Sequence, residues 1–214
     1  MHSRMKFEKN ESVLVLGGSR GLGKALVDDF QNNKIPVESI SRKSTHSFDF
    51  SKMDSWPEVV EKIRALQPTR IFYCAAGGPY GDFQKFDWKD HTWSLKVTFE
   101  FPAYLIHQLL KNEIKSVKQV CVIGSSIAES QVDPGASMYC AAKHGLKGLI
   151  LTLQKQDLTF DLRLLSPGYM NTDLLPKGTK PRNQGQTVDP AAIAGLMIHS
   201  ITDPNLRCSH QSFD

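Results

Sequence analysis

The segment Tyr-Cys-Ala-Ala-Lys at residues 139–143 places a phenol and an ammonium group four residues apart, near the start of a stretch with helical spacing. Residues i and i+4 share one face of a helix, so Lys143 is expected beside Tyr139. A phenol has a pKa of about 10, and a neighbouring cation favours the phenolate and lowers that pKa. Tyr139 could then exchange a proton with a substrate oxygen. Taken alone, the pair equally fits an ordinary amphipathic helix.

A serine ends an apolar run upstream of this pair. Residues 118–126, Lys-Gln-Val-Cys-Val-Ile-Gly-Ser-Ser, have the composition of a buried strand that ends at Ser126. In open α/β sheets, ligands bind beyond the carboxyl ends of the strands. We therefore expect the Ser126 hydroxyl to hydrogen-bond a substrate carbonyl oxygen, on which negative charge grows when a hydride attacks the carbon.

A glycine-rich turn follows the first apolar run directly. Gly17, Gly21 and Gly23 stand in the spacing GxxxGxG, between a predicted strand at 12–18 and a predicted helix at 23–33. Glycines let the chain turn sharply and let the backbone approach a pyrophosphate, which the helix N-terminus attracts. The alternative is a plain glycine-rich turn. The strand before it and the helix after it favour a dinucleotide site.

The second predicted strand, 36–41, ends without a carboxylate that could hold the ribose hydroxyls of NAD. Arg42 and Lys43 stand there instead, and Arg20 lies inside the glycine turn. Guanidinium groups suit a 2′-phosphate, which they can bind with two hydrogen bonds. NADP(H) is therefore the favoured cofactor, and NAD(H) stays an alternative. The arginine and lysine could also be ordinary solvated surface cations that bind no ligand.

Strand-like and helix-like segments alternate along nearly the whole chain. This order predicts an α/β protein with a Rossmann-like, doubly wound parallel sheet in a three-layer α/β/α arrangement. The 214 residues suit a single domain over 1–214 with a short C-terminal tail. The polar, glycine- and proline-containing stretch 176–190 is expected to be a loop over a site.

Composition argues against several other classes. The formal net charge of +4 is not concentrated in a basic tract, so no nucleic-acid partner is expected. The four cysteines form no CxxC pair and complete no zinc spacing, so no metal is expected. No apolar stretch is long enough to span a bilayer, and the N-terminus lacks the apolar region of a signal peptide. We expect a cytoplasmic protein without a membrane partner.

Taken in order, these motifs resemble those of the short-chain dehydrogenase/reductase family, over nearly the whole chain. Ser126 precedes Tyr139 by 13 residues, a separation usual in that family, which makes Ser125 the weaker candidate. The matching segments are Gly-Gly-Ser-Arg-Gly-Leu-Gly at 17–23, Ser-Arg-Lys at 41–43, Phe-Asp-Phe at 48–50, Ala-Ala-Gly-Gly at 75–78, Ile-Gly-Ser-Ser at 123–126, Tyr-Cys-Ala-Ala-Lys at 139–143 and Ser-Pro-Gly-Tyr-Met-Asn-Thr at 166–172.

The resemblance assigns roles to residues beyond those reasoned above. It implies Asp49 at the adenine, and Met170 and Thr172 near the nicotinamide carboxamide. It places Thr98 where the family often has an asparagine that bends a helix and anchors a proton relay, and Ala75 where the family usually has another asparagine. The implied catalytic residues are Ser126, Tyr139, Lys143 and Thr98. The implied cofactor-binding residues are Gly17, Ser19, Arg20, Gly21, Leu22, Gly23, Arg42, Lys43, Asp49, Ala75, Ala76, Gly77, Tyr139, Lys143, Pro167, Gly168, Met170 and Thr172.

The predicted function is an NADPH-dependent reductase of a small-molecule carbonyl compound, or the alcohol dehydrogenase run in reverse. Thr98 and Ala75 motivate an alternative, a catalytically weak dinucleotide-binding regulator or signalling protein on the same fold. The seventh strand of the family is expected to be weak or clipped here. The assembly expected from the sequence is a homodimer through the predicted helices 88–112 and 138–155.

Overall fold

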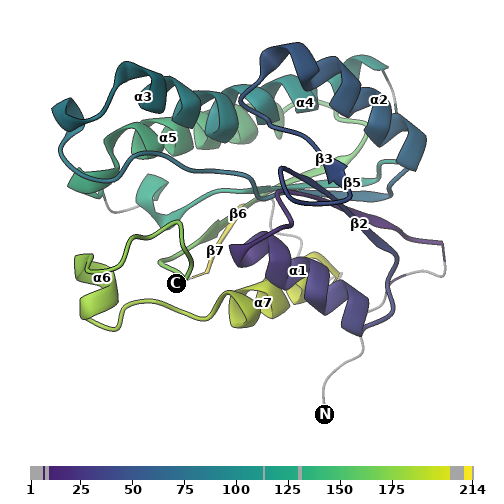
Figure 1. The fold of residues 1–214 in the computed structure, drawn as a ribbon. Coiled ribbons are helices and arrows are strands. Elements are labelled where there is room, and N and C mark those ends of the chain that lie inside the picture. The colour runs from purple at the N-terminus through teal and green to yellow at the C-terminus, as the bar shows by residue number, and fades with distance from the viewer. Residues whose placement is uncertain (1–6, 8–9, 113, 130–131, 203–209, 214) are drawn as a thin grey trace.

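The computed structural model describes residues 7, 10–112, 114–129, 132–202 and 210–213. Its strands form one sheet in the order β3-β2-β1-β4-β5-β6-β7, and every neighbouring pair is parallel (Figure 1). The predicted Rossmann-like parallel sheet is thereby confirmed. The strands are β1 (Val13–Leu16), β2 (Val37–Ser41), β3 (His46–Ser47), β4 (Arg70–Tyr73), β5 (Gln119–Ile123), β6 (Asp161–Pro167) and β7 (His210–Phe213).

Helices cover both faces of the sheet, as the alternation predicted. In Figure 1, α1 and α7 lie below the sheet, and α2, α4 and α5 lie above it. The helices are α1 (Gly21–Asn32), α2 (Trp56–Leu66), α3 (Trp88–Leu95), α4 (Phe101–Asn112), α5 (Ser137–Leu153), α6 (Lys180–Asn183) and α7 (Pro190–Thr202).

The strands are apolar on both sides because both of their faces are buried. Leu14 and Leu16 of β1 belong to the core cluster under α2, α4 and α5. Val13 and Val15, whose side chains point to the opposite face, belong to the cluster under α1 and α7. These two cores fix the position of β1, and therefore the point where the glycine turn leaves it.

The long helix predicted at 88–112 contains an irregular turn. Between α3 and α4, Lys96–Glu100 form a π-helical segment. Such turns widen a helix locally and occur frequently at functional sites. The carbonyl of Val97 in this turn accepts a hydrogen bond from the buried Tyr73 hydroxyl, so the backbone there is tied to the end of β4.

Two expectations about the later part of the chain need correction. The seventh strand is present, since β7 pairs with β6 from Leu164↔His210 to Pro167↔Phe213. It is held further by Glu129, whose Oε1 lies 2.8 Å from His210 Nε2. The cavity described below is lined by residues 172–175 but by none of 176–190, the stretch predicted to cover the site.

Three properties of the described ranges bear on partners. No helix within them is long and apolar enough to cross a membrane. No grouping of three or more His, Cys, Asp or Glu side chains within them could hold a metal ion. Cys74, Cys121 and Cys140 are free thiols, and Cys208 lies outside the described residues.

Candidate active site

The glycine turn lies where the strand order reverses, between β1 and β4. Gly17 has a φ of +92°, and a Cβ on it would lie 2.6 Å from the backbone nitrogen of Ala75. A Cβ on Gly23 would come closer than 3.0 Å to the Gly17 carbonyl oxygen. Both positions therefore exclude larger residues. They leave the N-terminus of α1 open at the point where parallel α/β sheets bind nucleotide phosphates.

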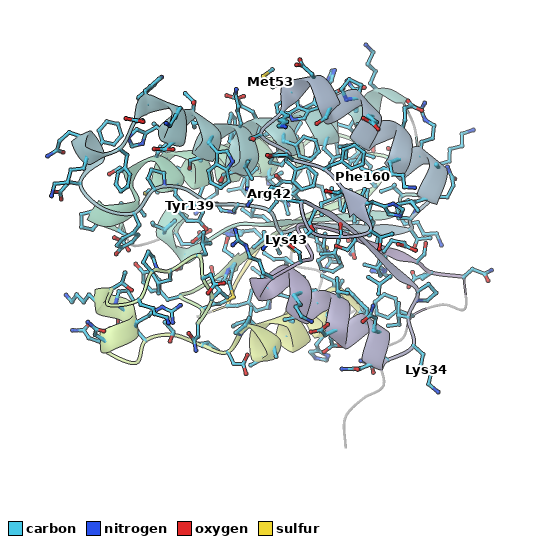
Figure 2. The ribbon with its side chains drawn as sticks, viewed as in Figure 1. Lys34, Arg42, Lys43, Met53, Tyr139 and Phe160 are labelled. Carbon is cyan, nitrogen blue, oxygen red and sulfur yellow. The ribbon has the colours of Figure 1, made fainter. Side chains whose placement is uncertain are left out.

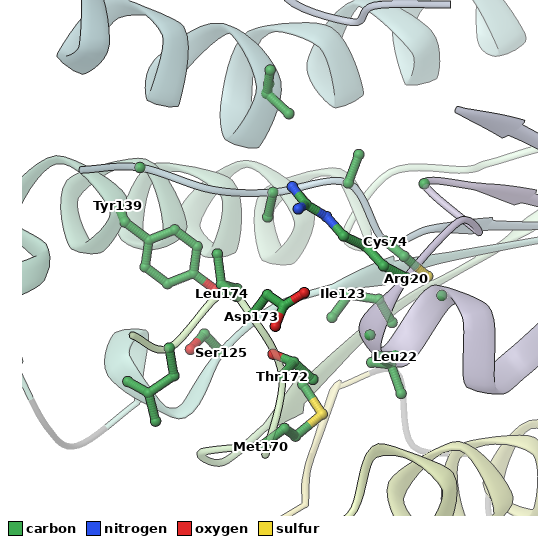
Figure 3. A pocket seen from close by; sticks show the side chains of 18 of the residues that line it. Arg20, Leu22, Cys74, Ile123, Ser125, Tyr139, Met170, Thr172, Asp173 and Leu174 are labelled. Carbon is green, nitrogen blue, oxygen red and sulfur yellow. The ribbon is translucent and has the colours of Figure 1, made fainter. Parts of the chain in front are cut away.

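One cavity extends from this turn to the start of α5. Predicted site residues that line it are Gly17, Ser19, Arg20, Gly21, Leu22, Gly23, Arg42, Asp49, Ala75, Ala76, Ser126, Tyr139, Lys143, Pro167, Gly168, Met170 and Thr172. The cavity thus joins a phosphate-binding turn to a cluster of proton donors, an arrangement that fits a dinucleotide lying along it. Figure 3 shows part of this cavity, with Tyr139 at the left of the view and Arg20 nearer its centre.

Three predicted site residues do not line the cavity. Lys43 is exposed beyond the end of β2. Gly77 is packed so closely on Trp93 that a Cβ would lie 2.7 Å from the indole ring. Thr98 is fully buried, and its Oγ1 lies 3.2 Å from both the nitrogen and the oxygen of Gly77. Thr98 therefore supports the segment after β4.

Positive charge gathers at the end of the cavity near β2. Arg42 follows β2 directly (Figure 2), and its guanidinium carbon lies 5.9 Å from the centre of the Trp93 ring. Partial burial raises the pKa of Asp49. Hydrogen bonds from Ser51 and the charges of Arg42 and Lys52 outweigh that effect, so the Asp49 pKa lies below its ordinary value. Asp49 is therefore a carboxylate at neutral pH and can accept hydrogen bonds.

The predicted catalytic residues Ser126, Tyr139 and Lys143 come together where β5 ends and α5 begins. The side chains of Ser125 and Tyr139 face each other in Figure 3, and Ser125 acts to lower the pKa of the Tyr139 hydroxyl. Ser126, the predicted catalytic serine, also lines the cavity, at the start of the 3₁₀ turn Ser126–Ala128. Ser125 is extended and caps that turn, because its hydroxyl accepts a hydrogen bond from the Ile127 nitrogen at 3.4 Å. Both serines line the cavity, and the role of Ser126 at a substrate oxygen stays a prediction.

Lys143 lies on the same helix face as Tyr139, as the spacing predicted. Its Nζ is 5.6 Å from the centre of the Tyr139 ring and donates a 2.6 Å hydrogen bond to the Ile123 carbonyl. The side chain is buried, and desolvation lowers the pKa of Lys143 to about 7.

The Tyr139 pKa is raised in this structure, whereas the sequence predicted that Lys143 would lower it. Burial raises the pKa of Tyr139 to about 12, and the hydrogen bond from Ser125 offsets only part of that rise. Because desolvation disfavours the ammonium form of Lys143, this group provides little positive charge to stabilise a phenolate. Tyr139 is therefore a protonated phenol at neutral pH, which is the form that donates a proton.

A second polar group in the cavity was missed from the sequence. Tyr80 and Tyr169 both hydrogen-bond the carboxylate of Asp133, and all three residues line the cavity. They come from three separate loops, so no local motif joins them. The only sequence signal is Asp133 in an Asp-Pro-Gly turn, six residues before Tyr139.

Comparison with known proteins agrees with this geometry. A family model described as short chain dehydrogenase matches residues 37–183, more than half of the chain. The chain is 22% identical over 207 residues to the PIGF/3-ketodihydrosphingosine reductase fusion protein of Schizosaccharomyces pombe, and this match covers 80% of the chain but only 42% of that protein. It is 21% identical to the cyclic-di-GMP-binding biofilm dispersal mediator protein of Escherichia coli, over 87% of each protein.

Solved structures share the fold. A short chain dehydrogenase from Burkholderia cenocepacia J2315, crystallised in complex with NADP, superposes with a TM-score of 0.78. The two sequences are 17% identical, and the superposition covers 99% of this chain and 98% of that one.

Proposed function

Since this chain belongs to the short chain dehydrogenase family, we propose that it is an NADPH-dependent oxidoreductase. It reduces a small-molecule carbonyl compound, or oxidises the corresponding alcohol, by hydride transfer. One observation carries the proposal. Ser125, Tyr139 and the neighbouring Lys143 line the same cavity as the glycine turn at the reversal of strand order.

The glycine turn and the N-terminus of α1 would hold the cofactor phosphates, and Asp49 would accept a hydrogen bond at the adenine end. Pro167, Gly168, Met170 and Thr172 would flank the nicotinamide. When bound, the reduced nicotinamide supplies the hydride that goes to the carbonyl carbon. The substrate oxygen then gains the proton that completes the alcohol, and this proton comes from the protein.

Tyr139 donates that proton. Its pKa of about 12 keeps the hydroxyl protonated at neutral pH, which is the form that can donate a proton. The Ser125 hydroxyl hydrogen-bonds the same oxygen and stabilises the charge that grows on it. Lys143, held on the Ile123 carbonyl, would lie within reach of the nicotinamide ribose and of Tyr139, and its ammonium form would stabilise the phenolate that proton donation leaves.

NADP(H) is the cofactor that the charges favour. Arg42 and Arg20 both line the cavity, and both are exposed side chains free to close on a phosphate. A 2′-phosphate would give them a partner that NAD(H) lacks. The complex of the Burkholderia protein with NADP is in accord with this preference.

Fluorescence titration and a carbonyl screen test the proposal. We expect NADPH to bind more tightly than NADH, and Arg42→Ala to narrow that difference. We expect Tyr139→Phe to lower turnover about 100-fold or more, within the range for a general acid, while NADPH binding is retained. Normal turnover by Tyr139→Phe would refute the catalytic assignment.

A weakly catalytic regulator is the second candidate. It is favoured by the similarity to the cyclic-di-GMP-binding mediator. It is also favoured by Thr98, which stands where the family often has an asparagine and which hydrogen-bonds the backbone of Gly77. The same screen separates the two functions. Binding of NADPH without oxidation by any aldehyde, ketone or quinone would support the regulator and count against the reductase.

The proposal extends to assembly and compartment. We include a single domain over 1–214 in the cytoplasm, where the free thiols of Cys74, Cys121 and Cys140 would stay reduced. The assembly is a homodimer through α3, α4 and α5. Light scattering after size-exclusion chromatography measures its mass, and a monomer at micromolar concentration would rule the dimer out.

A further inference from the structure

A carboxylate is buried at the substrate end of the cavity. Asp133 is only 8% exposed. It accepts hydrogen bonds from the Tyr80 hydroxyl at 3.1 Å on each oxygen, from the Tyr169 hydroxyl at 3.2 Å and from the Gly135 nitrogen at 2.9 Å. The group is thus well hydrogen-bonded, and every one of its donors is neutral.

Short stretches of chain connect Asp133, Tyr169 and Tyr80 to residues that were assigned to proton transfer or to the cofactor. Asp133 caps the 3₁₀ turn Pro134–Ala136, which leads directly into the first turn of α5 and Tyr139. Tyr169 follows Gly168, one of the residues assigned to the nicotinamide. Tyr80 lies after the Gly77 segment, and its ring packs on Gly135 so tightly that a Cβ there would lie 2.8 Å away.

The charge of Asp133 has no positive partner. Within the described residues it forms no ion pair, and the cations that line the cavity are Arg20, Arg42 and Lys143. The two arginines belong to the cofactor end, and Lys143 is bonded to the Ile123 carbonyl. A buried charge without a counter-ion is costly, so a cationic ligand group gains more here than at the surface.

The hydroxyl groups of Tyr80 and Tyr169 offer a ligand hydrogen-bond acceptors but no donors. Each tyrosine has a single hydroxyl hydrogen, and Tyr80 and Tyr169 both direct it to Asp133. Their oxygens therefore offer only lone pairs to anything else in the cavity. Desolvation and the nearby Asp133 carboxylate raise the pKa of both tyrosines, which keeps them protonated in this arrangement.

We propose that Tyr80, Asp133 and Tyr169 form a specificity site that selects a carbonyl substrate bearing an amine or another cationic hydrogen-bond donor. A substrate with a carboxylate at that position is rejected, because it meets a buried negative charge and acceptor atoms alone. The inference rests on the proposed reductase function, since that function makes this end of the cavity the substrate end.

Asp133 also has a structural role as the cap of Pro134–Ala136, and the test must separate the two. Asp133→Asn keeps an oxygen that can accept from Gly135, because asparagine is as good a cap as aspartate. It removes the charge and introduces an amide donor. The control variant Asp54→Asn removes one charge from an exposed position outside the cavity.

The experiment compares three ketones of matched shape: 4-(aminomethyl)acetophenone, 4-methylacetophenone and 4-acetylbenzoate. Their dissociation constants are measured by calorimetry in the presence of NADP⁺, where no reduction can occur. Wild type and Asp54→Asn should bind the amine more tightly than the carboxylate by roughly 10- to 100-fold, the range for hydrogen bonds to charged groups. In Asp133→Asn this preference should fall to within about threefold of unity.

Each outcome decides the inference. A wild-type protein that binds the carboxylate as well as the amine, an unchanged preference in Asp133→Asn, or binding of none of the three at millimolar concentration would overturn it. Reduction is then measured separately with NADPH. Absence of reduction together with the expected binding preference would count against the proposed function and leave the specificity site standing.

Discussion

The buried amine of Lys143 should make the stability of the protein depend on pH in a defined direction. Desolvation lowers its pKa from 10.5 to about 7 in the folded protein. Between these values the unfolded chain binds a proton that the folded chain does not, so the free energy of unfolding rises with pH. Lys143→Met keeps a long side chain in the same place and removes the titrating group.

The size of the effect follows from the two pKa values. Where the folded and unfolded chains differ by one bound proton, the free energy of unfolding changes by about 1.4 kcal/mol per pH unit. With a folded value of about 7, the wild type should gain about 2 kcal/mol between pH 7 and pH 9, relative to Lys143→Met. For a chain of this length that corresponds to a shift of roughly 4–8 °C in Tm.

Urea denaturation of both proteins without cofactor, at several pH values from 7 to 9, measures this difference. Other titrating groups contribute equally to both proteins and cancel. Lys85→Met, which removes an exposed lysine, serves as the control and should follow the wild type. Parallel pH curves for wild type and Lys143→Met would show that the buried amine keeps its ordinary pKa, and the reasoning from desolvation would be refuted.

Two further predictions concern the site and the helices around it. Ser125→Ala should lower turnover far more than Ser126→Ala, because Ser125 is the serine that faces Tyr139 and acts on its pKa; steady-state kinetics with equal or reversed losses would instead support Ser126 as the catalytic serine. Gly23→Ala should weaken NADPH binding and destabilise the fold, since its Cβ would collide with the Gly17 carbonyl. Gly148 is an exposed position inside α5, and no atom lies within 4 Å of a Cβ added there. Gly148→Ala should therefore raise the free energy of unfolding by roughly 0.5–1 kcal/mol. Thermal unfolding measures the stability of both glycine variants, and fluorescence titration measures their NADPH binding.

Much of the fold was predictable because its signals are local. Apolar runs such as 13–16 and 119–123 are buried on both faces, a property that distinguishes strands of a parallel sheet from half-exposed strands. β7 was underestimated because its sequence, His-Gln-Ser-Phe, is polar. It is stabilised by pairing with β6 and by the contact of His210 with Glu129, which are 81 residues apart.

The features that could be predicted before the fold was known are those that depend on neighbouring residues along the chain. These are the glycine turn between strand and helix, and the i, i+4 relation that brings Lys143 to the face of Tyr139. Packing of the folded chain was needed to bring the Ser125 side chain to face Tyr139, since neighbouring residues at the end of β5 direct their side chains differently. It also decided the sign of the Tyr139 pKa shift, because burial is a property of the packed molecule. Asp133 meets Tyr80 and Tyr169 across separations of 53 and 36 residues, and no local pattern encodes such a contact.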